Sequence, residues 1–272
     1  MKSSKEFLGK VVLVTGAARG IGLGIARRFA EEGARVFIAD INRERGETAS
    51  SNLRHDGLLS DFMHIDLSLP GSASAMVAKA FELGGKLDVL VNNARAGNRL
   101  RMLDETEENW NLALMVNLTA AFFASQAAIR LMTELGGCRI VNVASVAASQ
   151  VTLESPSYHA SKAGLLHLTK YLAVFGGEFG THVNGVLPGL IVQEEHRSRF
   201  HGPDNEIYKA LATHYQPLNE VGTERNVADA ILYLCSSRAS YVSGTCITVD
   251  GGATAQEPFG LLQSWRTSRD EY

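Results

Sequence analysis

The sequence has few cysteines, and their arrangement excludes the structures that cysteines usually support. The three residues, Cys138, Cys235 and Cys246, are odd in number and have no Cys-x-x-Cys spacing. They therefore predict buried thiols in a reducing compartment and not a disulfide framework or a zinc site. The eight histidines also lack metal-ligand spacing, so we predict no metal site.

The sequence also lacks a clear targeting peptide or membrane span. Residues 1–10 contain lysines but no apolar core of the kind that signal peptides have. The most apolar stretch, 112–132, is interrupted by Asn117, Gln126 and Arg130, which would be costly in lipid. We expect a buried or interface helix there, and a cytoplasmic protein with no membrane partner.

No excess of basic charge is present. Lys and Arg number 26 against 29 for Asp and Glu, which gives a net charge of −3 and argues against a nucleic-acid partner. With 272 residues, 45% of them hydrophobic, and no linker or repeat, the chain has the composition of one large globular domain covering 1–272.

Apolar segments with strand character alternate with segments of helical period along most of the chain. This alternation is typical of a parallel sheet with helices on both faces. We predict a single doubly wound α/β (Rossmann) domain with about seven strands. The expected strands are 11–15, 34–40, 62–65, 87–91, 139–144, 182–187 and 246–249, and the expected helices are 21–32, 44–54, 72–83, 107–135, 157–176 and 223–235.

Two segments do not follow the alternation. Residues 190–216 are polar, and we predict that they form a substrate loop or lid. Residues 253–272 form a C-terminal tail that contains Phe259 and Trp265. Ligands bind beyond the carboxyl ends of the strands in such folds, which is where both segments would lie.

A glycine-rich turn joins the first strand to the first helix, with the sequence Thr-Gly-Ala-Ala-Arg-Gly-Ile-Gly over 15–22. Glycines there allow the backbone to approach a pyrophosphate at the helix N-terminus. Asp40 ends the second strand, 18 residues after the last glycine, and predicts an acceptor for the adenosine ribose hydroxyls. The alternative is that Asp40 only caps a turn.

Tyr158 and Lys162 are spaced i, i+4 on a predicted helix, so both project from one face. A phenol has a pKa near 10 and is a poor base at neutral pH. A nearby ammonium favours the phenolate, so we expect Lys162 to lower the pKa of Tyr158. His159 is about 100° further round the helix and is expected to face away from the tyrosine.

Two further polar residues are placed where they can assist this pair. Ser145 follows the fifth strand, where its hydroxyl either holds a substrate oxygen or caps a turn. Asn117 lies within an apolar helix, where an amide is costly unless it is hydrogen-bonded. It either makes a structural bond or takes part in a relay behind Lys162.

With these residues the chain resembles the short-chain dehydrogenase/reductase family over nearly its whole length. Each of the motifs is weak alone, but their order along the chain is specific. They are Thr15-Gly16-x-x-x-Gly20-x-Gly22, Asp66, Asn92-Asn93-Ala94, Asn117, Ser145, Tyr158-x-x-x-Lys162, Pro188-Gly189 and Val249-Asp250-Gly251-Gly252.

The resemblance implies a nicotinamide-dependent oxidoreductase that interconverts a secondary alcohol and a ketone. It implies that Tyr158 is the acid/base, that Ser145 positions the substrate, and that Lys162 binds the nicotinamide ribose. Asn117 would hold the water of a proton relay. It also implies a homotetramer in which the helices at 107–135 and 157–176 contact other subunits.

The resemblance also implies a set of cofactor-binding residues, with Asp66 at the adenine amine. The set is Gly16, Arg19, Gly20, Ile21, Gly22, Asp40, Ile41, Asp66, Leu67, Asn93, Ala94, Tyr158, Lys162, Pro188, Gly189 and Ile191. Because Asp40 and Ile41 place a carboxylate and no base where a 2′-phosphate would lie, we expect NAD and less readily NADP, although Arg19 and Arg43 are near in sequence.

Two departures from the family pattern concern the nicotinamide and the substrate pocket. Arg95 replaces the usual glycine after Asn-Asn-Ala, at the substrate pocket. Gln193 replaces the threonine that the family usually has four residues after the Gly of Pro-Gly, where it binds the nicotinamide carboxamide. We predict that Arg95, Gln150 and Gln193 contact a polar substrate, such as a sugar, cyclitol or hydroxy acid. The alternatives are an apolar steroid or cyclic alcohol, and a dinucleotide-binding regulator without turnover.

Overall fold

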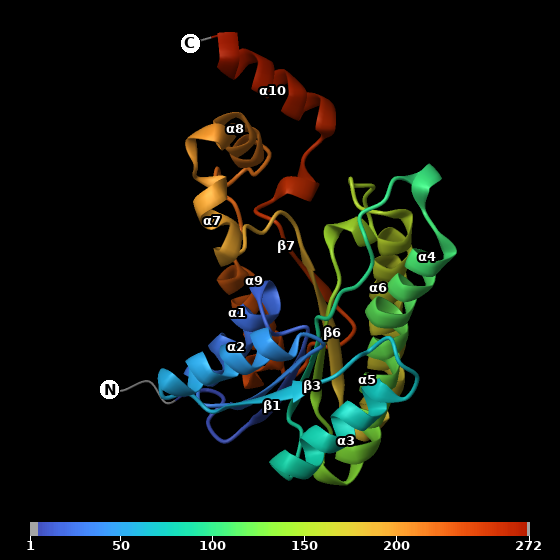
Figure 1. The fold of residues 1–272 in the computed structure, drawn as a ribbon. Helices are drawn as coiled ribbons and strands as arrows, with labels where there is room; N and C mark the ends of the chain where they lie inside the picture. The colour runs from blue at the N-terminus through green and yellow to red at the C-terminus, as the bar shows by residue number, and fades with distance from the viewer. Residues whose placement is uncertain (1–4, 271–272) are drawn as a thin grey trace.

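A computed structural model describes residues 5–270 of the chain and contains one parallel sheet of seven strands (Figure 1). Every predicted strand is present, and the ends differ from the predicted ones by at most two residues. The strands are β1 (Val11–Thr15), β2 (Arg35–Asp40), β3 (Ser60–His64), β4 (Val89–Asn92), β5 (Arg139–Val143), β6 (His182–Pro188) and β7 (Cys246–Val249).

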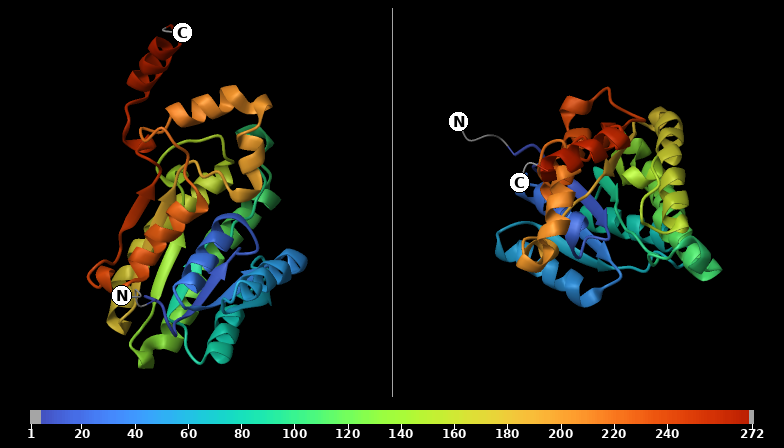
Figure 2. Two further views of the ribbon diagram at one scale, coloured as in Figure 1. Left: turned by 90° about the vertical axis from the view of Figure 1, so that its left-hand side faces the viewer. Right: turned by 90° about the horizontal axis from the view of Figure 1, so that it is seen from above.

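Helices cover both faces of this sheet, as predicted. Figure 1 and the two views in Figure 2 show the two layers, with the strands between them. One layer consists of α1 (Gly20–Glu31), α2 (Arg43–His55) and α9 (Glu224–Cys235). The other consists of α3 (Ser72–Gly84), α4 (Glu107–Leu114), α5 (Ala120–Met132) and α6 (Pro156–Gly176).

The buried residues of β1 explain why a continuous apolar run forms a strand here. All five residues of β1 are buried. Val12 and Val14 pack toward the α1 and α9 layer, whereas Val11 and Leu13 pack toward α3 and α5. A strand covered on both faces needs apolar residues at every position, because successive side chains point to opposite faces.

The strand order, β3-β2-β1-β4-β5-β6-β7, changes direction at β1. The chain runs outward from β1 to β3 and then returns to place β4 on the other side of β1. In parallel sheets of this kind, ligands bind beyond the carboxyl ends of the strands at this switch. The ends of β1 and β4 are therefore where the site is expected.

The predicted helix over 107–135 is continuous but not uniform. Between α4 and α5 lies a π-helical segment, η2 (Met115–Thr119), which contains Asn117. The helix is long and apolar enough to cross a membrane, with a mean hydropathy of 1.7 in its most apolar window. In this structure it contacts α3 and α6 within the domain.

The polar segment 190–216 is mostly helical, so the prediction of a loop is wrong for its structure. It forms α7 (Glu194–Phe200) and α8 (Glu206–His214). Phe200 and Ala212 are buried together with Val192 in a small cluster of their own. Leu190 and Val221 pack against this cluster, and the prevailing polarity of the segment obscures these few apolar residues.

The predicted tail forms α10 (Pro258–Asp270), which extends beyond α8 at one end of the molecule (Figures 1 and 2). Trp265 contacts His214 of α8, with the ring centroids 5.0 Å apart. The prediction for the tail runs to residue 272, and its last two residues lie outside the described part of the chain.

Asp88 joins β1 and β4 at the sheet edge opposite the carboxyl ends. Its carboxylate accepts hydrogen bonds from the Val11 amide at 2.9 Å and from Lys10 at 2.9 Å, and it pairs with Lys86 at 3.1 Å. Burial alone would raise the pKa of this carboxyl group, but these donors outweigh burial and lower it.

Because the pKa of Asp88 is lowered by folding, its stabilisation is complete above the ordinary value of about 3.9 and is lost as the pH falls through the lowered value. Asp88→Asn should therefore lose about 1 to 3 kcal/mol of the free energy of unfolding at pH 7. Thermal melts of both proteins should converge as the pH falls below about 4. The exposed Asp104→Asn is the control, and equal melting temperatures at pH 7 would contradict the role of Asp88.

Candidate active site

The glycine turn after β1 has a geometry that only glycine permits. Gly16 has a φ of +63°, and a Cβ there would lie 2.7 Å from the Cα of Ala94. A Cβ at Gly22 would lie 2.3 Å from the carbonyl oxygen of Gly16. Both positions bring two stretches of backbone into contact, and a methyl group at either one would separate them.

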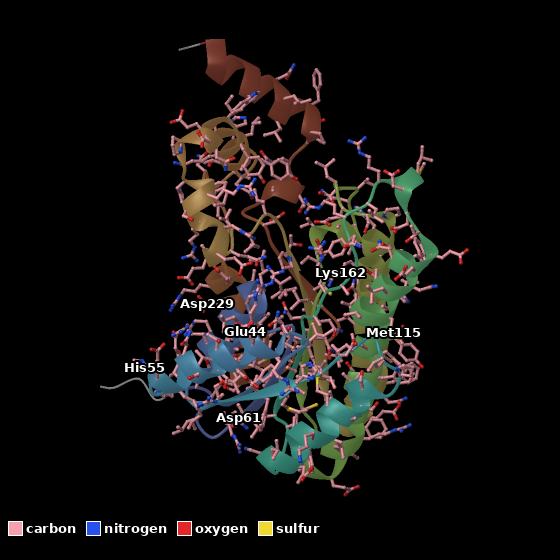
Figure 3. All side chains as sticks on the ribbon, in the orientation of Figure 1. Glu44, His55, Asp61, Met115, Lys162 and Asp229 are labelled. Atoms are coloured by element: carbon pink, nitrogen blue, oxygen red, sulfur yellow. The ribbon has the colours of Figure 1, made fainter. Side chains whose placement is uncertain are left out.

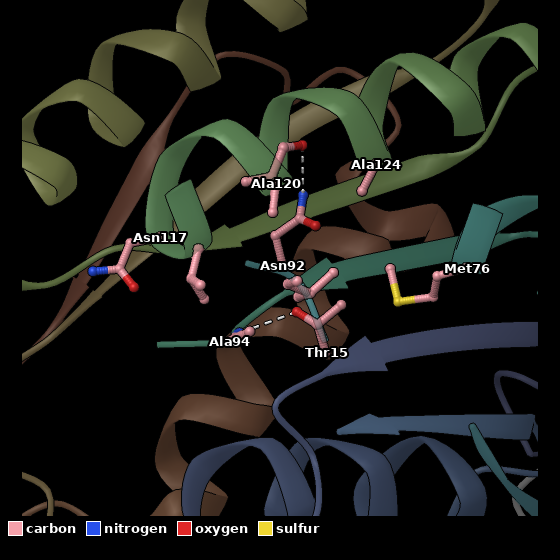
Figure 4. Close-up of a pocket in the computed structure, with 10 residues that line it drawn as sticks. Thr15, Met76, Asn92, Ala94, Asn117, Ala120 and Ala124 are labelled. Carbon is pink, nitrogen blue, oxygen red and sulfur yellow. Dashed lines mark hydrogen bonds between the residues drawn. The ribbon is translucent and has the colours of Figure 1, made fainter. Parts of the chain in front are cut away.

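Thr15 and Asn93 fasten this turn to the end of β4. The amide of Asn93 donates to the carbonyl oxygens of Thr15 at 2.8 Å and Gly16 at 3.0 Å. The hydroxyl of Thr15 accepts from the backbone amides of Asn93 at 2.9 Å and Ala94 at 3.0 Å. Figure 4 shows Thr15 and Ala94 joined in this way beside Asn92, with Asn117 nearby. Asn93 thus holds the turn in shape.

Asp40 lies against the same turn. One carboxylate oxygen accepts from the Ala18 amide at 3.0 Å, and the other accepts from the Asn42 amide at 2.9 Å. The structure therefore shows the turn contacts of Asp40 directly. A bond to a ribose hydroxyl stays a prediction, although the carboxylate is in the right place at the end of β2.

The segment before α7 lies over the other side of the glycine turn. A Cβ at Gly20 would lie 2.1 Å from Oε1 of Gln193, so this side chain rests directly on the turn. Arg19 pairs with Glu195 at 2.6 Å. Glu224, the first residue of α9, holds α7 in place by accepting a hydrogen bond from the Arg197 side chain at 2.6 Å.

These features fit a dinucleotide. The absence of a Cβ at Gly16 and Gly22 lets the turn fold tightly against the end of β4, and the first turn of α1 has no acidic residue and no side-chain cap. Its amide groups and the helix dipole suit a pyrophosphate. Gly16, Arg19, Gly20, Ile21 and Gly22 would hold the phosphates.

The remaining predicted cofactor residues lie at the ends of β2, β3 and β6. Asp66 accepts from Ser68 through the backbone amide at 2.9 Å and the hydroxyl at 2.6 Å, and these bonds lower the pKa of its carboxyl group. Leu67 is buried and Ile41 is exposed. The others, Pro188, Gly189 and Ile191, follow one another at the end of β6, where Ile191 bridges to Gly222.

Ser145, Tyr158 and Lys162 meet at the ends of β5 and α6. Ser145 caps a short 3₁₀ turn by accepting from the Ala147 amide at 3.1 Å, and its hydroxyl also bonds that of Tyr158. Ser155 caps α6 by accepting from the Tyr158 amide at 3.3 Å. The turn cap expected for Ser145 is therefore observed, whereas its contact with a substrate oxygen stays a prediction.

Lys162 lies in the middle of the molecule (Figure 3) and is buried. Its ammonium donates to the carbonyl oxygen of Val143 at 2.7 Å and lies 5.7 Å from the centre of the Tyr158 ring. Burial, with a smaller contribution from Arg95, lowers the pKa of Lys162 to about 7.

Burial raises the pKa of Tyr158 above its ordinary value, and the hydrogen bond from Ser145 and the charge of Arg95 oppose this only in part. The expected lowering of this pKa by Lys162 is not found in the structure. The reason is that removal of water from the phenol costs the charged form more than its polar neighbours return.

Asn117 is buried in the π-helical segment η2 and is fully hydrogen-bonded. Its amide nitrogen donates to the hydroxyl of Ser161 at 3.0 Å, and its oxygen accepts from the Ala96 amide at 2.8 Å. Ser161 precedes Lys162 on α6, so Asn117 links the loop after β4 to the catalytic helix. The structural bond is therefore observed, whereas the water relay stays a prediction.

Three charged residues form the mouth of the site. The guanidinium of Arg95 lies 4.7 Å from the centre of the Tyr158 ring and pairs with Glu154 at 2.8 Å. Arg99 pairs with the other oxygen of Glu154. Sequence reasoning missed Glu154 and Arg99, although an acid four residues before Tyr158 and a second arginine four residues after Arg95 were visible signals.

The predicted substrate residues are thus found in different places. Arg95 and Gln193 flank the site, one over Tyr158 and one over Gly20. Gln150 is exposed on the loop after Ser145. The His159 side chain lies against the loop that precedes α6, where its Nε2 accepts a hydrogen bond from the Thr152 amide at 2.9 Å. Among the side chains that the structure describes, no group of three or more His, Cys, Asp or Glu is placed to hold a metal ion.

A family model described as enoyl-(acyl carrier protein) reductase matches residues 16–254. An oxidoreductase of Thermotoga maritima is 37% identical over 252 residues, 92% of this chain and 99% of that protein. A solved structure of a short-chain alcohol dehydrogenase from Sinorhizobium meliloti superimposes with a TM-score of 0.84 at 31% identity, covering 93% of this chain and all of the other.

Relatives with named substrates are also similar. A D-threitol dehydrogenase of Mycolicibacterium smegmatis is 34% identical, over 90% of this chain and 93% of its own length. A 7alpha-hydroxysteroid dehydrogenase of Bacteroides fragilis is 33% identical, over 93% and 97%. The matches span the glycine turn and the Ser145, Tyr158 and Lys162 site, and the chain belongs to the short-chain dehydrogenase/reductase family, the oxidoreductases that use NAD(P)(H) to interconvert alcohol and carbonyl groups.

Proposed function

We propose that this protein interconverts a polar secondary alcohol and its ketone, with Tyr158 as the acid/base and NAD as the preferred cofactor. The observation that carries the proposal is the meeting of Ser145, Tyr158 and Lys162 beside a glycine turn that fits a dinucleotide. A binding protein without turnover would not need a phenol placed beside both Ser145 and Lys162.

Each residue has a defined task in this proposal. The Ser145 hydroxyl holds the substrate oxygen next to the phenol, and Tyr158 takes the proton of the alcohol or gives it to the ketone. Lys162, on the same face of α6, orients the cofactor ribose and adds positive charge near the phenol. A bound nicotinamide supplies or accepts the hydride. Asn117 fixes the loop after β4 against α6, so that these groups keep their positions relative to one another.

The polarity of the mouth supports a substrate with several hydroxyl groups. Arg95, Arg99 and Glu154 lie beside Tyr158 and offer donors and an acceptor in a small space. Pockets for steroids or fatty chains are mostly apolar. A sugar, cyclitol or hydroxy acid can satisfy these polar groups, and the name of the D-threitol dehydrogenase relative agrees with such a substrate.

We also propose a homotetramer. Large apolar side chains are exposed on the outer faces of α5 and α6, among them Phe123, Val174 and Phe175, which are 44%, 69% and 51% exposed. Several large apolar side chains exposed on neighbouring helices favour an interface with another protein chain. The helices concerned are those expected from the sequence, and the cytoplasmic location stays a prediction.

Tyr158→Phe should lower kcat by roughly 100- to 10,000-fold, because it removes the phenolic proton and leaves the ring in place. Turnover is followed by nicotinamide absorbance, and cofactor affinity by fluorescence titration should stay nearly unchanged. Tyr171→Phe, on an exposed position of the same helix, is the matched control. A Tyr158→Phe protein with more than about a tenth of the parent kcat would refute this assignment.

NAD should be used with kcat/KM roughly 100- to 1,000-fold higher than NADP, because a 2′-phosphate would face the Asp40 carboxylate. The two arginines that could offset this repulsion already have acidic partners, Arg19 with Glu195 at 2.6 Å and Arg43 with Glu47 at 3.6 Å. Asp40→Asn keeps an acceptor for the backbone amides and should lower the ratio of kcat/KM with NAD to kcat/KM with NADP. Comparable kcat/KM values for the two cofactors in the parent protein would contradict the preference.

The substrate class is tested by a panel of alcohols. Linear polyols, cyclitols, aldoses and hydroxy acids are compared with hydroxysteroids and cyclohexanols at matched concentrations. The best polar substrate should exceed the best apolar one by at least about tenfold in kcat/KM, since an apolar ligand would displace water from the charged groups at the mouth without replacing its hydrogen bonds. Preference for hydroxysteroids would favour the alternative substrate class, and no turnover with any alcohol would favour the regulator.

A further inference from the structure

A cation covers one face of the Tyr158 ring. The guanidinium carbon of Arg95 is 4.7 Å from the ring centre, closer than the ammonium of Lys162 at 5.7 Å. Arg95 enters the site from the loop after β4, whereas Tyr158 and Lys162 both belong to α6. The tyrosine therefore has one cation on its own helix and a second, nearer one supplied by another part of the fold.

Glu154 holds Arg95 in this position. It pairs with Arg95 at 2.8 Å, and its side chain is only 16% exposed. The loop that carries it is anchored by His159, whose Nε2 accepts from the Thr152 amide at 2.9 Å and whose Nδ1 lies 2.8 Å from the Ser155 carbonyl oxygen. Because Nε2 accepts, the proton of the neutral imidazole is on Nδ1 and is donated to Ser155.

The charges in this cluster do not cancel. Glu154 is shared by Arg95 and Arg99, so two guanidinium groups face one carboxylate. The remaining positive charge lies beside the phenol. A cation on the face of an aromatic ring is attracted to the neutral ring and more strongly to its anion, so it favours the phenolate over the phenol.

We propose that Arg95 is a positioning residue for proton transfer, held by Glu154 on the face of the Tyr158 ring so that the phenol loses its proton more readily. The proton leaves to water, and the phenolate then accepts the proton of the alcohol. The inference deepens the proposed function and rests on it for the role of Tyr158. It assigns Arg95 to the acid/base and not to a substrate anion.

Other groups besides Arg95 also act on the ionisation of Tyr158. Burial raises the pKa of Tyr158, the Ser145 hydrogen bond and then Arg95 lower it, Glu154 raises it by less, and Arg99 lowers it by less still. His159 presents its ring edge with the ring centres 6.4 Å apart. Arg95 is thus the largest favourable charge on the tyrosine in the described part of the chain.

The ionisation of Tyr158 can be read without turnover. Tyrosines carrying ¹³C at Cζ are observed by NMR across the alkaline range, and the Tyr158 signal is identified by its loss in Tyr158→Phe. In Arg95→Met the ionised fraction of Tyr158 at about pH 10 should fall about tenfold, which corresponds to a shift of one pH unit. Arg95→Lys, which keeps the charge, should recover part of the loss.

Two further variants separate this role from general damage. Arg99→Met removes a cation from the same carboxylate but not from the ring face, and should change the ionised fraction less than about threefold. Glu154→Gln keeps an acceptor for Arg95 and removes the opposing charge, so it should raise the ionised fraction. An unchanged fraction in Arg95→Met, or an equal change in Arg99→Met, would overturn the proposal.

Kinetics then distinguish the inference from the proposed function. In alcohol oxidation, the midpoint of the acidic limb of the kcat/KM profile should move to higher pH by about one pH unit in Arg95→Met. A rise in KM with an unmoved limb would overturn the inference, because Arg95 would then act on the substrate. A shifted Tyr158 signal in a protein that oxidises no alcohol would support the inference on ionisation and reject the proposed function.

Discussion

The reversal of strand order at β1 is the constraint on which the rest of this structure depends. Because β4 returns to the side of β1 opposite β2, the segments after these two strands end close together. The contact between Gly16 and Ala94 and the bonds of Asn93 to the glycine turn exist only because of this adjacency. The same edge receives Ser145 from β5 and, through α6, Tyr158 and Lys162.

Beneath this edge, a buried chain of amides and hydroxyls fixes the layer that carries the acid/base. Asn92 on β4 donates to Asn142 on β5 at 2.9 Å, and Asn142 donates to Thr169 on α6 at 2.9 Å. Buried polar groups of this kind are costly unless they are bonded, so the bonds favour a single register of sheet and helix. Asn117 continues the connection by joining the loop after β4 to α6.

Much of this could be predicted from the sequence, because the evidence was local or periodic. Apolar runs such as 11–15 identify strands buried on both faces, and the spacing of Tyr158 and Lys162 places both on one face of a helix. The π-helical segment around Asn117 was not predicted, because one extra residue in a helical turn leaves the apolar pattern almost unchanged. Nor was the fold of 190–216, whose core is limited to three apolar residues.

The electrostatics of the site could not be predicted from the order of residues at all. Whether Lys162 or burial controls the pKa of Tyr158 depends on distances and on removal of water, and in the structure burial is the larger effect. The partnership of Arg95 with Glu154 joins residues 59 positions apart. Such contacts are a product of the tertiary fold.

At this edge of the sheet we expect direct transfer of a hydride between a bound secondary alcohol and a bound nicotinamide. Transfer of isotope tests it most directly. A polar secondary alcohol deuterated at its carbinol carbon is incubated with the protein and NAD, and the reduced cofactor is isolated and examined by NMR. We expect one deuterium at C4 of the nicotinamide, on a single face of the ring. Reduced cofactor without deuterium, or deuterium divided between both faces, would contradict it.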